Sequence, residues 1–361
     1  MASNLGLLGG YPEPCGPMPL EDTKTKAVAV RFPLLGLLLM VGGCLGTNPR
    51  QVVRGPLASR PQHPLGLTFL ALRPRTARTQ APGTSAVGVQ TSYTSIYEAN
   101  TIGVDRVVFD GELSRSSVLF RRGLAERVDL ELELGLLYTT SGFLDSTLER
   151  FHGVFFLPDG GRSEGPRDRY AMHIDRAGDR LYGLEEDRLG FTDSPLVVTA
   201  AILDEEPTSW RPGVAMRAGL ELPTGSEERG FGSGGVDWGA GVLVEKSRGR
   251  WTWTAAVDLI APDPTDSLVD AGVEIRDFVQ LQSGAEFRWS NTCSVLAQLF
   301  LTTPFTRDIE LEEINREILD LGLGLAFDVS ERSRLVVSFH EDLVAATGPD
   351  FTLRIGWTWG F

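Results

Sequence analysis

The sequence of 361 residues predicts an all-β fold, an antiparallel transmembrane β-barrel. Three observations support this prediction. In residues 351–361, apolar side chains alternate with polar residues or glycine, so one face of the terminal strand is wholly apolar. Segments of roughly nine to fourteen residues with similar alternation recur from residue 85 onward, a length that suits tilted membrane strands. The connections between these segments alternate between short polar turns and longer loops.

Residues 1–44 are predicted to be a cleaved leader. Lys24, Lys26 and Arg31 precede an apolar run from Phe32 to Gly43, the pattern of a signal peptide. This run is shorter than the ~18 to 20 apolar residues that a membrane-spanning helix needs. A start at Met18 would give the leader an ordinary length.

Cysteine and charge limit the chemistry of the chain. Cys44 ends the apolar run in a sequence similar to a bacterial lipoprotein box, so it is a lipidation candidate, with ordinary cleavage near Gly46 as the alternative. Cys293 then stands alone, which excludes an internal disulfide and a cysteine metal site. The net charge of -14, with no basic run after the leader, argues against nucleic-acid binding. No cofactor and no metal site are predicted.

Residues 45–83 are predicted to form a periplasmic N-terminal segment or a plug, and residues 84–361 the barrel. The segment is rich in proline and arginine, unlike the alternating sequence that follows. Residues 47–82 are also the part of the chain expected to contact a periplasmic partner, if one exists.

Fourteen strands are expected, with twelve as the alternative. The pair 168–187 is weak because arginine and aspartate interrupt its apolar face. Both numbers are even, as a closed barrel with both termini in the periplasm requires. The expected strands are 85–98, 104–122, 127–139, 168–176, 180–187, 192–203, 209–222, 235–247, 250–261, 277–289, 292–303, 316–329, 333–343 and 350–361.

The longest loop is expected to carry a short helix. Within Ser141–Phe156, Leu144, Leu148 and Phe151 recur at helical spacing. Such a helix could fold into the barrel mouth or pack on its rim. Tryptophan supports the membrane assignment, because six of the seven tryptophans fall at one predicted end of the strands, where indole rings prefer the membrane interface.

The chain ends on a strand that resembles the closing strand of bacterial outer-membrane barrels. The residues that carry this resemblance are Arg354, Gly356, Trp359 and the terminal Phe361. The resemblance implies an outer-membrane location, outer-membrane lipid around the barrel, and recognition of the last strand by the barrel-assembly machinery.

Several short motifs resemble an uncharacterised family of Gram-negative bacterial proteins that carry a domain of unknown function and are predicted outer-membrane barrels. The resemblance spans nearly the whole mature chain and implies the same fold and location, but no catalytic residues. Its motifs include Asp110-Gly111-Glu112, Leu157-Pro158-Asp159-Gly160-Gly161-Arg162, Leu222-Pro223-Thr224-Gly225, Gly232-Ser233-Gly234 with Asp237, and Pro349-Asp350-Phe351.

The alternation of the strands places a set of charged side chains in the lumen. An acid-rich passage would favour cations or polar solutes. Alternatively, arginines and carboxylates neutralise one another across a filled barrel. The candidates are Asp129, Glu131, Glu133, Arg217, Glu221, Asp258, Glu286, Arg288, Asp320, Asp328 and Arg354.

The predicted function is passage of small solutes across the outer membrane. The first alternative is a structural or assembly barrel with a filled lumen, and the second is a lipid-modifying enzyme. Catalysis is not expected, because a base needs a nucleophile and an orienting partner. Linear spacing shows neither beside His152 or His340, although His340 is expected to face the lumen.

Overall fold

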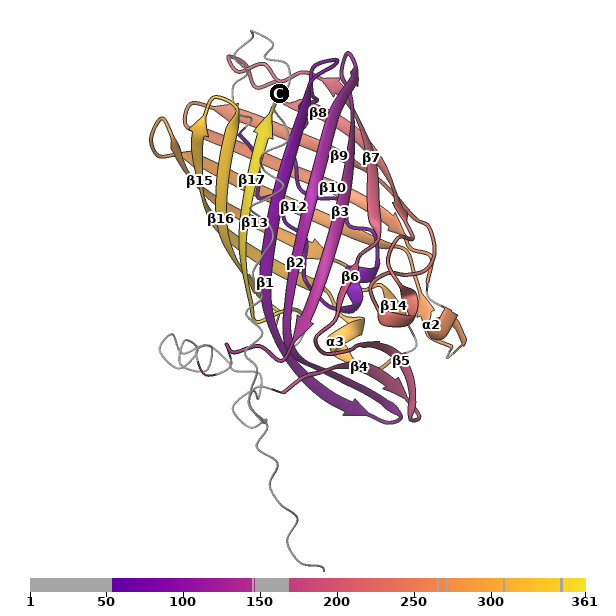
Figure 1. Ribbon diagram of the computed structural model, residues 1–361. Coiled ribbons are helices and arrows are strands. Elements are labelled where there is room, and N and C mark those ends of the chain that lie inside the picture. Colours follow the sequence, from indigo (N-terminus) through magenta and orange to yellow (C-terminus); the bar gives the residue numbers. More distant parts are fainter. Residues whose placement is uncertain are drawn as a thin grey trace, which may run out of the picture. The chain divides into compact units, whose positions relative to one another are not determined.

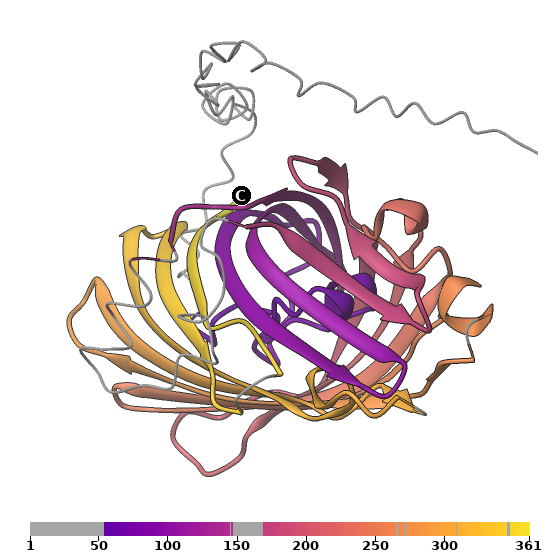
Figure 2. The same ribbon diagram turned by 90° about the horizontal axis from the view of Figure 1, so that it is seen from below.

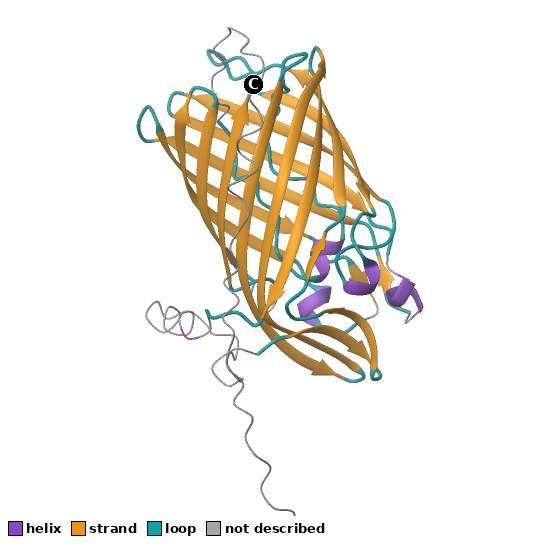
Figure 3. Cartoon of the chain, in the orientation of Figure 1, coloured by secondary structure: helices purple, strands orange, loops and turns teal. Residues whose placement is uncertain are grey.

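The computed structural model describes residues 54–361 except 145, 147–168, 265, 271, 308, 345 and 346. Twelve antiparallel strands form a closed barrel in which the last strand pairs with the first (Figures 1 and 3). These strands are β1 (Ser85–Ile102), β2 (Asp105–Ala125), β3 (Val128–Thr140), β7 (Ser194–Leu203), β8 (Gly213–Leu222), β9 (Asp237–Arg248), β10 (Trp251–Ala261), β12 (Phe278–Arg288), β13 (Cys293–Thr302), β15 (Ile318–Ser330), β16 (Ser333–Asp342) and β17 (Phe351–Gly360).

The expected number of fourteen strands is wrong, and the alternative of twelve is confirmed. The weak pair 168–187 does form strands, β4 (Ala171–Arg176) and β5 (Asp179–Leu184). However, β4 pairs with Asp105–Asp110 of β2, whereas β3 pairs with β2 only from Glu112 onward. The hairpin therefore extends the sheet beyond the barrel wall. A third extra strand, β6 (Leu189–Phe191), pairs with β3 beside β7.

The remaining elements are short and lie in the connections. They are the 3-10 helices η3 (Leu65–Thr68) and η5 (Glu227–Arg229), the helices α2 (Asp266–Asp270) and α3 (Glu312–Asn315), and the strand pair β11 (Glu274–Ile275) and β14 (Thr306–Arg307). The helix expected within Ser141–Phe156 falls almost entirely outside the described residues. Among the described helices, none is long and apolar enough to cross a membrane.

The two ends of the barrel differ. Short turns join β2 to β3, β9 to β10 and β15 to β16 at one end, here called the turn end. The longer connections, with β4, β5, α2 and α3, lie at the opposite end, here called the loop end (Figure 1). The seam of the barrel closes at the turn end, where Ser85 and Phe361 exchange backbone hydrogen bonds of 2.8 and 2.9 Å.

The wall is apolar outside and polar inside, the reverse of a water-soluble barrel. On β3, Leu134 is 51% exposed while its neighbour Glu133 is 3% exposed. Trp251, Trp253 and Trp357, near the turn end, are 42–44% exposed on the outer surface. An apolar outer face with tryptophans near one end and a polar inner face are typical of transmembrane β-barrels.

The largest apolar core lies toward the loop end. Residues that precede the first strand, including Leu65, Phe69 and Leu72, are buried there. They pack in one cluster with Phe109 of β2, with wall residues such as Leu137 and with Phe305 of the β13–β15 connection. This core holds the N-terminal part of the described chain inside the barrel (Figure 2).

Candidate functional site

Residues 54–84, here called the inner segment, run into the barrel and back out. Arg54 donates to the carbonyl of Arg250 at the turn end. Near its midpoint the segment reaches the loop end, where the Tyr182 hydroxyl donates to the carbonyl of Pro64 over 3.0 Å. The segment then returns to the turn end, where the Gly83 amide donates to the Gly123 carbonyl over 3.0 Å. Figure 2 shows it within the ring of strands.

Two wall carboxylates of β3 hold arginines of the inner segment. Arg75 binds Asp129 in a bidentate pair, with Nη1–Oδ1 at 3.0 Å and Nη2–Oδ2 at 2.8 Å. Glu133 binds Arg73 through both carboxylate oxygens and also accepts from Arg115 over 2.7 Å. Two parallel N–H···O bonds fix orientation as well as charge. Removing one partner of such a buried pair typically costs about 3–5 kcal/mol.

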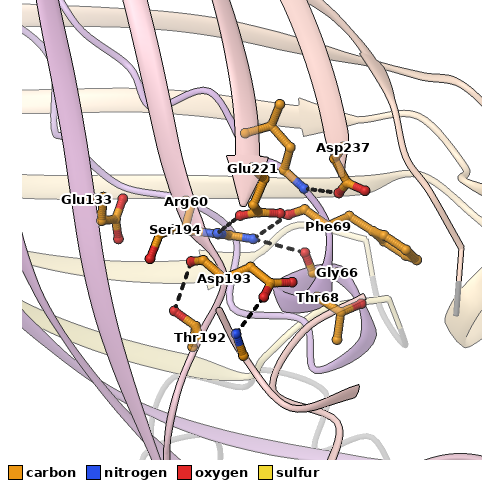
Figure 4. Close-up of polar contacts among 12 residues, drawn as sticks. Arg60, Gly66, Thr68, Phe69, Glu133, Thr192, Asp193, Ser194, Glu221 and Asp237 are labelled. Carbon is orange, nitrogen blue, oxygen red and sulfur yellow. Dashed lines mark hydrogen bonds and ion pairs between the residues drawn. The ribbon is translucent and has the colours of Figure 1, made fainter. Parts of the chain in front are cut away.

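Arg60 closes the turn of the inner segment at the loop end. Its Nη2 donates to the carbonyls of Gly66 at 3.1 Å and Phe69 at 2.8 Å (Figure 4). Its Nη1 lies 3.9 Å from Oε1 of Glu221 on β8. Beside it, the Leu70 amide donates to Asp237 over 2.7 Å. The wall thus supplies acceptors for both the side chains and the backbone of the segment.

A second group of wall residues binds the backbone of the inner segment. Arg217 pairs with Asp258 over 2.6 Å and also donates to the carbonyl of Arg73. Glu286 accepts from the Gly55 amide over 2.8 Å and pairs with Arg334 over 2.8 Å. Backbone groups buried away from water need such partners, since a buried unpaired donor or acceptor costs roughly 1–3 kcal/mol.

The other predicted lumen residues pair with the wall or with the segment backbone. Glu131 pairs with Arg121 of β2, and Arg288 with Asp328. Arg354 donates to the carbonyl of Arg60 over 3.1 Å. The segment arginines that bind the predicted carboxylates were missed. A signal for these pairs was present, because an arginine-rich stretch precedes strands with acidic inward faces. However, Arg75 and Asp129 are 54 positions apart, and no local sequence pattern identifies a pair at that separation.

Folding also brings together three residues that linear spacing did not connect. His340 Nδ1 lies 2.9 Å from Oδ1 of Asp320 on β15, and its Nε2 lies 3.0 Å from Oγ of Ser338. Ser338 and His340 are two residues apart on β16, so both face inward. With Nδ1–H donating to Asp320, Nε2 accepts from the Ser338 hydroxyl, the arrangement that activates a serine nucleophile. His152, the other histidine considered, lies outside the described residues.

His63 of the inner segment is a buried titratable group at 1% exposure, packed in the apolar core toward the loop end. Its Nδ1 accepts from the Gly66 amide at 3.1 Å, so the neutral ring carries its proton on Nε2, which contacts the Glu313 carbonyl at 3.1 Å. Phe109 and Phe305 contact the ring edge-on. Burial in this apolar site lowers the pKa of His63 from 6.5 to about 4.

Comparisons with known proteins agree with this architecture. A family described as "Protein of unknown function (DUF3187)" matches residues 41–361. No curated protein matches the chain. The crystal structure of the COG4313 outer membrane channel from Pseudomonas putida F1 is 15% identical, with a TM-score of 0.53, over 81% of this chain and 100% of that chain. This likeness shows a shared fold.

Two porin structures are also similar at lower scores. The NanC porin is 8% identical with a TM-score of 0.42, over 76% of this chain and 98% of that chain. The KdgM porin in complex with disordered oligogalacturonate is 7% identical with a TM-score of 0.41, over 76% of this chain and 99% of that chain.

Proposed function

This chain belongs to the DUF3187 family of proteins of unknown function, and we propose that it is an outer-membrane channel that the inner segment closes. The observation that carries this proposal is the path of the segment, which enters and leaves at the turn end. A segment with both ends on one side can be withdrawn as a loop without threading through the barrel. The fold that the chain shares with an outer-membrane channel supports the location and fits a role other than catalysis.

Withdrawal would expose a lumen lined by carboxylates. The arginines of the segment would leave with it, and Asp129 and Glu133 would lose their partners Arg75 and Arg73. An acidic, low-dielectric passage raises the local concentration of cations. We therefore propose that the open channel passes small polar solutes and favours cations. In the closed state the same carboxylates hold the segment in place.

The rival proposal is a permanently filled, structural barrel. Both proposals predict the same closed structure, so the test must change the freedom of the segment without changing the wall. A Cβ on Gly284 of β12 would lie 3.4 Å from the Cβ of Pro56 in the segment. This separation is just below the usual range for a disulfide, whose Cβ atoms lie about 3.5–4.5 Å apart, so cysteines at these positions need only a small adjustment to form one. Cys293 is replaced by serine to prevent mispairing.

The measurement is conductance in a planar bilayer with a salt gradient, for the oxidised and reduced forms of the Pro56→Cys/Gly284→Cys variant. A gated channel opens when the disulfide is reduced, passes cations preferentially, and stays silent when oxidised. The parent chain with Cys293→Ser alone should be insensitive to reductant. Silence of the inserted barrel in every form would support the filled structural barrel instead.

Ester hydrolysis is a second candidate function, favoured by the Ser338–His340–Asp320 hydrogen-bonded chain. A fluorophosphonate probe reacts with an activated serine, and Ser338→Ala is the matched control. Labelling of the native chain that Ser338→Ala abolishes would support hydrolysis. No labelling would leave the three residues as a buried polar contact of the wall.

A further inference from the structure

A cavity of about 460 Å³ lies at the turn end between the inner segment and strands β1, β16 and β17. It exists because the wall carries small residues there, including Gly88 of β1 and Gly356 of β17. A Cβ added to Gly88 would meet no atom closer than 3.6 Å, and one added to Gly356 none closer than 3.5 Å. The volume falls within the range of small-molecule sites, roughly 300–1,000 Å³.

The lining of this cavity is rich in arginine. Glu331 and Arg332 of the exposed β15–β16 turn contribute to it, so the cavity reaches the surface of the turn end. Among the described residues, the carboxylates in its lining are Glu131, which pairs with Arg121, and Glu331. The arginines are Arg54, Arg75, Arg121, Arg332, Arg334 and Arg354.

Arg354 differs from the other buried arginines of the lining. It is 5% exposed, and within the described part of the chain it forms no ion pair, whereas Arg75 and Arg334 bind carboxylates. Its Nη2 donates to the Arg60 carbonyl, but Nε and Nη1 have no acceptor among the described residues. A buried guanidinium with free donors favours an anion within reach.

Arg75, which also lines the cavity, supplies a second free donor from the inner segment. Its two Nη atoms bind Asp129 and neighbouring oxygens, but its Nε is buried without an acceptor among the described residues. The inner segment carries Arg75 and β17 carries Arg354. Guanidinium N–H groups from two elements of the lining match the several acceptor oxygens of a carboxylate or phosphate group.

We propose that the turn-end cavity binds a small solute carrying an oxyanion, a carboxylate or phosphate group, with Arg354 and Arg75 as the donors. Because Arg75 belongs to the inner segment, the complete site exists only while the segment is seated. A ligand that binds one state stabilises that state by mass action, so the anion holds the barrel closed. Only this consequence rests on the proposed channel function; binding itself does not.

The test is calorimetric titration of the purified full chain in detergent with succinate and, separately, with inorganic phosphate. The native chain should bind at least one of them. Arg354→Gln removes the charge and should weaken binding by about tenfold or more, the effect of losing a charged hydrogen bond. Gly88→Leu fills the cavity but keeps both arginines, and it should weaken binding as strongly. Arg248→Gln, an equal charge change on the outer surface near the turn end, should leave binding unchanged.

Several outcomes would overturn the proposal. Failure of the native chain to bind either anion at millimolar concentration would do so, as would unchanged binding in Gly88→Leu. Equal weakening by Arg248→Gln would show that only net charge acts. If Arg354→Gln fails to fold, Gly88→Leu alone decides the result. Binding without conductance in any form of the chain would keep the anion site and remove the channel, so the two proposals fail separately.

Discussion

Arg75 of the inner segment and Asp129 of β3 form a two-point ion pair inside the barrel, with N–O distances of 2.8 and 3.0 Å. The Arg75 side chain is 4% exposed and the Asp129 side chain 0%. The Gln80 amide donates to the same carboxylate over 2.9 Å. Asp129 therefore binds both a side chain and the backbone of the inner segment. A substitution at Asp129 is the most direct test of which contacts hold the segment in the barrel.

Replacing Asp129 by asparagine should loosen the inner segment. The change leaves the Arg75 guanidinium buried without a counter-charge, a loss of about 3–5 kcal/mol from the seated state. Trypsin should then cleave at Arg75 or Arg78 faster than in the native barrel. Asp204→Asn is the control, because Asp204 pairs with Arg127 on the surface with both side chains more than half exposed, and such pairs contribute about 0–1 kcal/mol. Equal cleavage in the two variants would contradict the prediction.

Lowering the pH should release the segment through His63. The folded pKa of about 4 lies below the usual 6.5, so the seated state binds fewer protons than the released state. The contribution of His63 is complete above pH 6.5 and is lost as the pH falls from 6.5 toward 4. A lowering of the pKa from 6.5 to about 4 corresponds to about 3 kcal/mol. Protonation also removes the acceptor that Nδ1 offers to the Gly66 amide.

Tryptic cleavage of the segment, measured between pH 7 and pH 5 with brief exposure to acid, checks this prediction. His63→Gln keeps a polar side chain that does not titrate, so the pH dependence of cleavage should become flatter. Any effect of the lumen carboxylates on cleavage is present in both the native chain and His63→Gln, so the difference between the two pH profiles isolates the effect of His63. An unchanged pH profile in His63→Gln would assign the effect to the carboxylates instead.

Replacing Phe69 by alanine should loosen the segment from the loop end. Phe69 is 1% exposed and its ring lies 5.6 Å from that of Phe305. Truncating a buried phenylalanine typically costs about 3–5 kcal/mol. Hydrogen exchange of the amides of residues 65–72 should accelerate, while the strands keep their protection. Phe143→Ala, at a position that is 69% exposed, serves as the control.

Changing the last residue should affect assembly more than stability. The backbone of Phe361 bonds to Ser85 at the seam, and its ring lies 5.3 Å from that of Trp359. Phe361→Ala keeps these backbone bonds, so refolding into detergent should remain efficient. If the assembly machinery reads the terminal aromatic residue, the amount of heat-modifiable barrel in outer membranes should fall several-fold. Equal amounts of barrel in cells would contradict recognition of this residue.

The strands could be predicted because their signal is local. Alternation with a period of two identifies each wall strand to within a few residues. For example, the strand expected at 277–289 is β12, Phe278–Arg288. The error over 168–187 has a different origin. These residues form strands as expected, but whether a strand joins the wall depends on which part of β2 it pairs with. That pairing is a long-range choice with no local pattern.

For the candidate site too, one part could be predicted from local sequence and another part could not. Alternation indicates which side chains of a strand share a face, because neighbouring side chains point to opposite sides. It cannot indicate what those side chains bind. Asp320 and His340 are 20 residues apart, on neighbouring strands, and Arg75 reaches Asp129 from outside the wall altogether. The expectation of an open, acid-lined passage therefore lacked the arginines that the inner segment places against the acids.

The local pattern of side chains was enough to predict an apolar exterior, a polar interior and antiparallel strands, since each follows from the side-chain period and from what a strand in lipid requires. The path of residues 54–84 through the lumen, the pairs that hold them and the arginine-lined cavity beside them arose only on folding. Their partners are distant in sequence, and a buried charge accepts whichever counter-charge the closed barrel brings within reach.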